Sequence, residues 1–143
     1  MLETLDAKEV SFGSFQGRTV FLNIWATWCS PCVGEIPSIQ KLHDAVNEQG
    51  IAVVLVTTEQ PEEVHRFVRK KGWHVPVYVA RRGLPAIFET HAIPATFFIN
   101  RRGEVVYQHT GRADWNTDAC RSFLRRLQEQ MESDATTGPG TGT

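Results

Sequence analysis

The chain has 143 residues, a formal net charge of −1 at pH 7 and an isoelectric point near 6.5. This length is enough for one domain whose core needs no disulfide to hold it together. The near-neutral charge argues against nucleic acid and against an anionic membrane surface as general partners.

The N-terminal residues predict a β-hairpin within Leu2–Phe15 and a loop that ends at Gly17. The apolar, β-prone run Thr19–Ile24 is typical of a buried strand. Apolar residues then recur at helical spacing over Ile36–Val46, which predicts a helix. A Cys-X-X-Cys motif, residues 29–32, therefore falls where a strand gives way to a helix.

The position of the two cysteines has chemical consequences. The first turn of a helix has unpaired N–H groups and about half a positive charge, so it stabilises an anion such as a thiolate. In such a place a cysteine pKa of about 8.5 can fall to about 3.5–7.5, which makes Cys29 a candidate nucleophile. Residues three apart on a helix lie about 5–6 Å apart, which allows a disulfide between Cys29 and Cys32. Pro31 suits the first turn, because its missing N–H has no helical partner there.

The middle of the chain completes a strand-helix-strand unit and begins another helix. Gly50 is placed to end the first helix, and Ile51–Val56 predicts a buried parallel strand. A helix is expected over Pro61–Gly72, followed by a short strand at Val75–Val79. Pro76 favours an edge position for that strand, because proline cannot donate a hydrogen bond to a neighbouring strand.

The C-terminal part predicts an antiparallel hairpin and a final helix. The hairpin joins Ala95–Ile99 to Glu104–His109 through a turn, and the helix is expected over Asp114–Met131. Residues 133–143 lack apolar side chains and predict a disordered tail. We therefore expect one domain over residues 1–132.

Two motifs of this chain resemble those of a known family. Phe21–Cys32, continued by Glu35 and Pro37, is similar to the active-site signature of the thioredoxin superfamily, and within it of the TlpA/ResA-like thiol-disulfide oxidoreductases. Ile93–Asn100, with Gly103 after it, is similar to a second signature of the same family. Two motifs in the right order are far more specific than either alone.

The resemblance implies an α/β, thioredoxin-like fold, with a central mixed β-sheet flanked by helices and an N-terminal hairpin. The segment between Thr58 and Pro94 resembles the central insert of TlpA/ResA relatives. Such relatives usually work outside the cytoplasmic membrane, behind a signal peptide or a membrane anchor. Met1–Thr4 resembles neither, and the sequence has no apolar run of about 18 residues. We expect a periplasmic or other extracytoplasmic location, with a leader or anchor that this sequence does not include.

The resemblance also implies roles for residues around the cysteines. It implies a cis peptide bond before Pro94, packed against the active-site disulfide. This bond leaves the Ile93 backbone free to pair with an extended partner. Trp28 flanks the nucleophile and is expected to be an apolar platform for the partner's backbone. Ser30 and Pro31, between the cysteines, are expected to contact the partner as well.

Glu35 is the candidate for proton transfer at Cys32, because it lies one helical turn later and ResA-like relatives have a glutamate there. Thioredoxins carry a buried aspartate at the place of Asn23, and that acid is absent here. Burial beside the thiols is expected to raise the Glu35 pKa. The alternative is a solvent-facing acid favoured by the helix dipole. Trp25 and Cys120 are expected to be packing residues.

Two alternative interpretations of the cysteine pair are a structural disulfide and half of a zinc site. A zinc site is disfavoured because no second Cys-X-X-Cys and no histidines at ligand spacing accompany the pair. We expect dithiol-disulfide exchange with protein partners, without a metal or organic cofactor. By resemblance, the direction is reduction, with a membrane electron carrier as the electron source and apocytochrome c as a substrate. A general disulfide oxidase and a non-enzymatic copper carrier are the other candidates.

Overall fold

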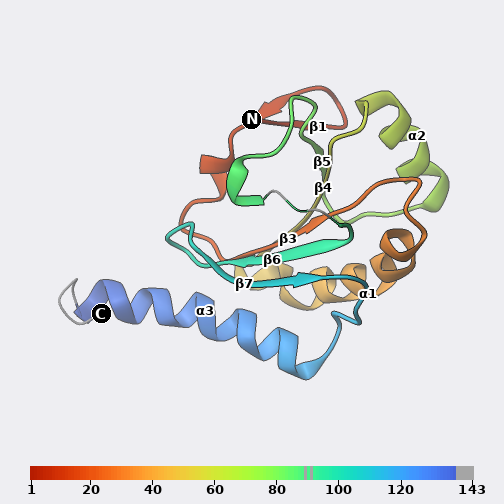
Figure 1. Ribbon diagram of the computed structural model, residues 1–143. Coiled ribbons are helices and arrows are strands. Elements are labelled where there is room, and N and C mark those ends of the chain that lie inside the picture. Colours follow the sequence, from red (N-terminus) through yellow and green to blue (C-terminus); the bar gives the residue numbers. More distant parts are fainter. Residues whose placement is uncertain (89, 91, 138–143) are drawn as a thin grey trace.

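The computed structural model describes residues 1–88, 90 and 92–137. Within these residues, seven strands form one sheet in the order β2-β1-β5-β4-β3-β6-β7 (Figure 1). The strands are β1 (Leu2–Thr4), β2 (Glu9–Val10), β3 (Val20–Ile24), β4 (Ala52–Thr57), β5 (Val77–Val79), β6 (Ala95–Ile99) and β7 (Val105–Thr110). The helices are α1 (Ser30–Val46), α2 (Pro61–Lys71) and α3 (Asp118–Thr137), with short 3₁₀ turns η1 (Phe12–Phe15), η2 (Asn47–Gln49) and η3 (Ala86–Phe88).

The centre of the sheet is β3, the strand that precedes the cysteines. It pairs in parallel with β4 and antiparallel with β6, so the sheet is mixed, as predicted. Every residue of β3 is buried, because the sheet is covered on both faces. In this register Asn23 lies between Leu55 of β4 and Thr96 of β6. The antiparallel pairing of β3 with β6 brings the two sequence motifs together at the same end of these two strands.

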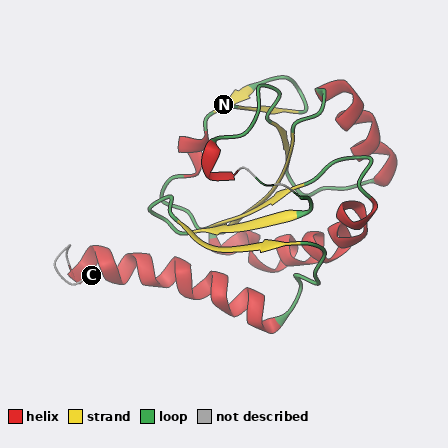
Figure 2. Ribbon diagram, viewed as in Figure 1, coloured by secondary structure: helices red, strands yellow, loops and turns green. Residues whose placement is uncertain are grey.

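Apolar side chains alternate between the two faces of the sheet. Phe21 packs in the cluster formed with α1, α2 and α3, whereas Leu22 packs in the cluster on the opposite face. That opposite face is covered by η1 and η3, whose Phe12 and Phe88 rings stack with centroids 5.5 Å apart. Figure 2 shows these two turns beside each other, on the side of the sheet away from α1 and α3. The core therefore has two apolar layers with the sheet between them.

The N-terminal hairpin is present and corrects one prediction. β1 pairs with β2 and also with β5, so β5 lies between β4 and β1. The predicted edge position for this strand is therefore wrong. Pro76 precedes β5, so its missing N–H interrupts no pair of the strand, and its carbonyl accepts the Leu55 N–H at 3.0 Å. The segment expected to be an insert contributes α2 and β5 to the core.

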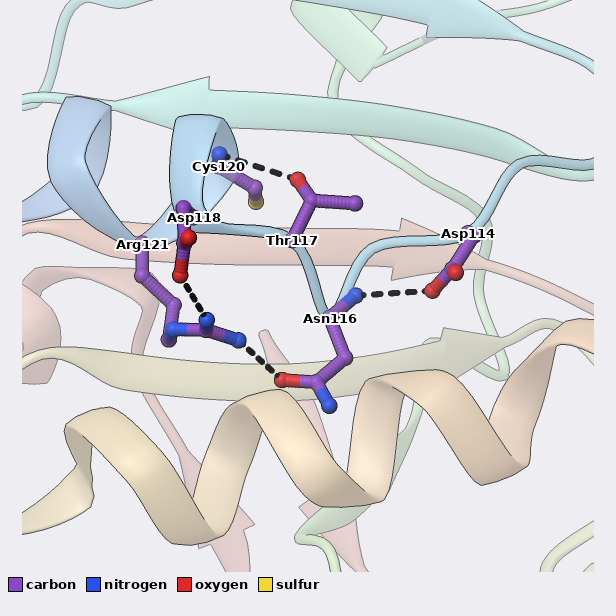
Figure 3. A network of polar contacts seen from close by, with 6 residues as sticks. All are labelled: Asp114, Asn116, Thr117, Asp118, Cys120 and Arg121. Carbon is purple, nitrogen blue, oxygen red and sulfur yellow. Dashed lines mark hydrogen bonds and ion pairs between the residues drawn. The ribbon is translucent and has the colours of Figure 1, made fainter.

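The C-terminal helix begins later than predicted. The sequence predicted a start at Asp114, but α3 starts at Asp118. The Thr117 hydroxyl accepts the Cys120 N–H at 3.1 Å, which is the hydrogen bond of a helix N-cap (Figure 3). Asp114 instead accepts the Asn116 N–H at 3.0 Å in the preceding turn. Local hydrogen bonds of these side chains therefore set the boundary.

The same helix also ends later than predicted. α3 continues to Thr137, past the expected end at Met131 and past the expected domain boundary at residue 132. No glycine or proline follows until Gly138, so the backbone offers no helix breaker. Residues 133–137 of the predicted tail are helical, and residues 138–143 lie outside the described residues. None of the described helices is both long and apolar enough to cross a bilayer.

Candidate active site

Cys29 ends the loop that joins β3 to α1. It is the N-cap residue of α1, and its sulfur accepts the Cys32 N–H at 3.3 Å. The Cα atoms of Cys29 and Cys32 are 5.2 Å apart, and the two residues form a disulfide. Cys32 is fully buried, whereas Cys29 is 5% exposed. The predicted place of the pair, at a strand-to-helix junction, is confirmed, and a backbone N–H points at the sulfur that would carry the thiolate.

The second motif lies directly beside this disulfide. The Ile93–Pro94 peptide bond is cis, as the resemblance implied. The Cys29 sulfur is 3.9 Å from the Ile93 carbonyl oxygen. Within the described part of the chain, the Ile93 N–H makes no backbone hydrogen bond. The Ile93 backbone therefore lies next to the disulfide, where an extended partner chain would approach it.

Three of the expected contact residues surround Cys29 at the surface. Trp28 is 73% exposed, and Ser30 and Pro31 are exposed as well. Trp25, in contrast, is 1% exposed and packs edge-on against Trp73, with centroids 5.5 Å apart. The two tryptophans of the motif therefore differ in kind: Trp25 belongs to the core, and Trp28 presents an apolar ring to solvent.

Glu35 is 2% exposed, so the solvent-facing alternative is wrong. Its Oε1 accepts a hydrogen bond from Asn23 Nδ2 at 2.8 Å. Its Oε2 accepts one from the Ala113 N–H at 3.1 Å and one from Trp115 Nε1 at 3.0 Å. Burial raises the pKa of Glu35 and outweighs these N–H bonds, which favour the carboxylate. A carboxyl group able to hold a proton at a raised pKa therefore lies one helical turn from Cys32.

Sequence reasoning missed the surroundings of this carboxyl group. Trp115 is 80 residues from Glu35 along the chain, and no local pattern links the two. The Asn23 amide also donates to Thr96 Oγ1 at 3.0 Å, because the β3-β6 register places these residues opposite each other. Asn23, Glu35, Thr96 and Trp115 thus form one buried polar group, which only the folded chain assembles.

A second carboxylate, also missed, fixes the loop before Cys29. Glu59 accepts the Thr27 N–H at 2.9 Å and the Thr27 hydroxyl at 2.6 Å. The Thr57 hydroxyl donates to the same carboxylate at 2.9 Å. The sequence could have indicated this contact, because β3 and β4 were predicted to be parallel and the carboxyl ends of adjacent parallel strands lie side by side. Glu59 therefore ties the end of β4 to the loop after β3.

Cys120 is a free cysteine buried on α3. Burial raises the pKa of its thiol to about 12, so it is a neutral thiol near pH 7. This supports the packing role expected from the sequence. Across residues 1–88, 90 and 92–137, no group of three or more His, Cys, Asp or Glu side chains is placed to hold a metal ion.

Comparison with known proteins places this chain in a family. A family model described as Redoxin matches residues 2–122. The chain belongs to the Redoxin family. Two relatives of this Redoxin protein are named thiol-disulfide oxidoreductase ResA. The one from Halalkalibacterium halodurans is 38% identical over 114 residues, which cover 78% of this chain and 64% of the relative. The one from Bacillus subtilis (strain 168) is 34% identical over 113 residues, which cover 78% and 63%.

The Redoxin chain thus spans just under two thirds of the length of these two relatives. Among solved structures, a thiol:disulfide interchange protein of the thioredoxin family from Chlorobium tepidum TLS is 25% identical, with a TM-score of 0.68. The match covers 90% of this chain and 89% of that one. The expected thioredoxin-like α/β fold is confirmed, and so is the expected sequence similarity to ResA thiol-disulfide oxidoreductases.

Proposed function

We propose that this Redoxin protein is a thiol-disulfide oxidoreductase that exchanges its Cys29–Cys32 pair with disulfides of partner proteins. One observation carries the proposal: the pair forms a disulfide at the N-terminus of α1, with the Cys29 sulfur 3.9 Å from the Ile93 carbonyl beside cis Pro94. The names of the ResA relatives support it. A disulfide with only a structural role would need neither a position at a helix N-terminus nor an exposed tryptophan, Trp28, beside it.

The exchange proceeds in two displacements at sulfur. The Cys29 thiolate attacks one sulfur of the partner's disulfide, and the partner's other sulfur leaves as a thiolate. Glu35 takes the proton of the Cys32 thiol, and Cys32 then attacks the Cys29 sulfur. The mixed disulfide breaks, the partner leaves with both cysteines reduced, and the Cys29–Cys32 disulfide is the product. The reverse sequence would oxidise a dithiol partner.

The remaining site residues hold the partner during these steps. The Ile93 backbone beside Pro94 pairs with an extended segment of the partner, as in strand addition to a sheet edge. Trp28, Ser30 and Pro31 form the exposed rim around Cys29 and contact the same segment. This arrangement selects partners by their backbone, so we propose proteins with exposed, extended disulfide segments as substrates.

We further propose that the protein acts as a reductase outside the cytoplasm. We propose a membrane carrier as the electron source and apocytochrome c as a substrate, as the resemblance of the two sequence motifs to TlpA/ResA-like proteins implies. The haem-attachment cysteines of apocytochrome c must be reduced before haem is joined to them. A Cys29–Cys32 pair on this fold is compatible with that chemistry and needs no further cofactor.

The redox potential tests the direction. Thioredoxin-type pairs span roughly −270 to −120 mV, and about 30 mV corresponds to tenfold in the equilibrium constant of this two-electron couple. We expect a value closer to the reducing end, measured by thiol trapping after equilibration in dithiothreitol buffers. A value near the oxidising end would make the protein a disulfide oxidase and would contradict the reductase proposal.

A trapping experiment identifies the partners. In the Cys32→Ser variant the second displacement is blocked, so mixed disulfides on Cys29 should accumulate. We expect protein adducts that dithiothreitol releases, with apocytochrome c among them when the variant is expressed outside the cytoplasm. The Cys29→Ser/Cys32→Ser double variant is the matched control and should capture none. If the single variant captures no more protein than the double variant, the exchange proposal is wrong.

A further inference from the structure

The segment Gly111–Ala113 connects the two halves of the candidate site. The Gly111 N–H donates to the Pro94 carbonyl at 2.8 Å, directly after the cis peptide bond. The Ala113 N–H donates to Glu35 Oε2 at 3.1 Å. The backbone of Arg112, between these two residues, is thereby held between Pro94 and the N-terminal part of α1. Its side chain is exposed.

The guanidinium of Arg112 lies against the backbone of α1 at Gly34. A Cβ atom at Gly34 would be 2.5 Å from Arg112 Nη1 and 2.9 Å from Cζ. Gly34 therefore leaves room for the guanidinium beside the active-site helix, and a methyl group there would displace this flexible side chain.

Arg112 and Lys41 line one polar pocket together with Glu35, Ser38, Asp114 and Asn116. The two carboxylates have N–H partners: Glu35 accepts three, and Asp114 accepts the Asn116 N–H (Figure 3). Neither cation forms a hydrogen bond or an ion pair with any other residue that the structure describes. Among the described residues, the pocket lining therefore holds two cations without an ion-pair partner, together with one exposed carboxylate, Asp114, beside the candidate site.

We propose that Arg112, with Lys41, binds an acidic side chain of the partner protein close to the disulfide that is exchanged. The inference rests on the proposed function and adds a substrate preference to it. A partner seated beside Pro94 lies next to the Gly111–Ala113 segment, because the Gly111 N–H is bonded to the Pro94 carbonyl. The planar guanidinium matches a carboxylate in shape and charge. Aspartate or glutamate near the reacting cysteine is the group that this pocket selects.

Two matched peptides test the preference. Each carries the same disulfide, flanked by glutamates in one peptide and by glutamines in the other, and the readout is the ratio of their kcat/KM values. We expect the intact protein to favour the acidic peptide by about two- to fivefold, the range of an exposed ion pair, with a ratio that falls as salt is added. Arg112→Gln should bring the ratio close to one, and Arg112→Lys should restore part of it.

Two further variants separate this proposal from a general effect of charge. Lys70→Gln removes an exposed cation on α2, outside the pocket, and should keep the ratio of the intact protein. Gly34→Ala places a methyl group where the guanidinium lies and should lower the ratio, but should not lower it further in the Arg112→Gln protein.

Equal kcat/KM values for the two peptides with the intact protein would overturn this inference and leave the exchange function standing. So would a ratio that Arg112→Gln does not change. If neither peptide is reduced at all, the proposed function itself fails.

Discussion

The Cys29→Ser variant is expected to lose disulfide exchange by roughly 10³-fold or more, because no other sulfur nucleophile at the site can reach a partner. Cys32 is fully buried beneath Cys29 and cannot replace it in attacking a partner. Cys120 is buried on α3, and its thiol stays protonated near pH 7 because burial raises its pKa to about 12. The measurement is reduction of a disulfide protein such as insulin with dithiothreitol as the electron source.

The same residue should stand out in alkylation of the reduced protein. The helix N-terminus and the Cys32 N–H stabilise the Cys29 thiolate, so its reaction with iodoacetamide should begin below the pKa of about 8.5 of a free cysteine. Mass spectrometry of peptides assigns the label to each cysteine, and Cys120 is the internal control that should remain unlabelled in the folded protein.

Two outcomes would contradict this account of Cys29. One is a Cys29→Ser protein that reduces insulin at the rate of the intact protein. The other is a Cys29 thiol that reacts at neutral pH no faster than a free cysteine, which would mean that the amides of α1 do not stabilise its thiolate.

The second large effect is expected from Glu35→Gln. If Glu35 accepts the Cys32 proton, its loss should slow the resolving step by about 10²-fold near neutral pH, as for removal of a general base. In the intact protein this rate should rise with pH as the carboxyl group, whose pKa is raised by burial, loses its proton. In the variant the rise should move to higher pH, toward ionisation of the Cys32 thiol itself. Single-turnover measurements with a preformed Cys29 mixed disulfide isolate this step.

The stability of the oxidised protein gives an independent test of the same group. The pKa of Glu35 is higher in the folded state than in the unfolded chain, so the folded state binds the proton more tightly. Its contribution to stability is fully present below the unfolded pKa and is lost as pH rises through the folded pKa. Urea denaturation across this range should show that loss in the intact protein and not in Glu35→Gln.

Glu48→Gln is the matched control for both measurements, because Glu48 is an exposed glutamate on η2, outside the site. It should keep the pH profile of the resolving step and the pH dependence of unfolding. If Glu35→Gln behaves like Glu48→Gln in the resolving step, Glu35 is a structural residue and another group takes the Cys32 proton.

Much of the fold could be predicted because its signals are local. The buried run before Cys29 and the helical spacing after Cys32 determine β3 and α1 from residues adjacent in the chain. The hairpin of β6 and β7 could also be predicted, from its two strands and the turn between them. The cysteine pair was identified for the same reason. Two cysteines three residues apart at the start of a helix are close enough to form a disulfide, and the helix N-terminus stabilises a thiolate.

The rest depended on contacts between residues far apart in the sequence. The interior position of β5 required the N-terminal hairpin to pair with it, and Pro76 alone pointed to the wrong answer. The surroundings of Glu35 required β6 beside β3 and Trp115 folded back from the chain before α3. The sequence by itself thus determined where the cysteine pair lies, because the cysteines and the helix terminus are neighbours along the chain. Only the tertiary structure decided how Glu35 is buried and where Arg112 lies, because desolvation and charge depend on what packs around a group.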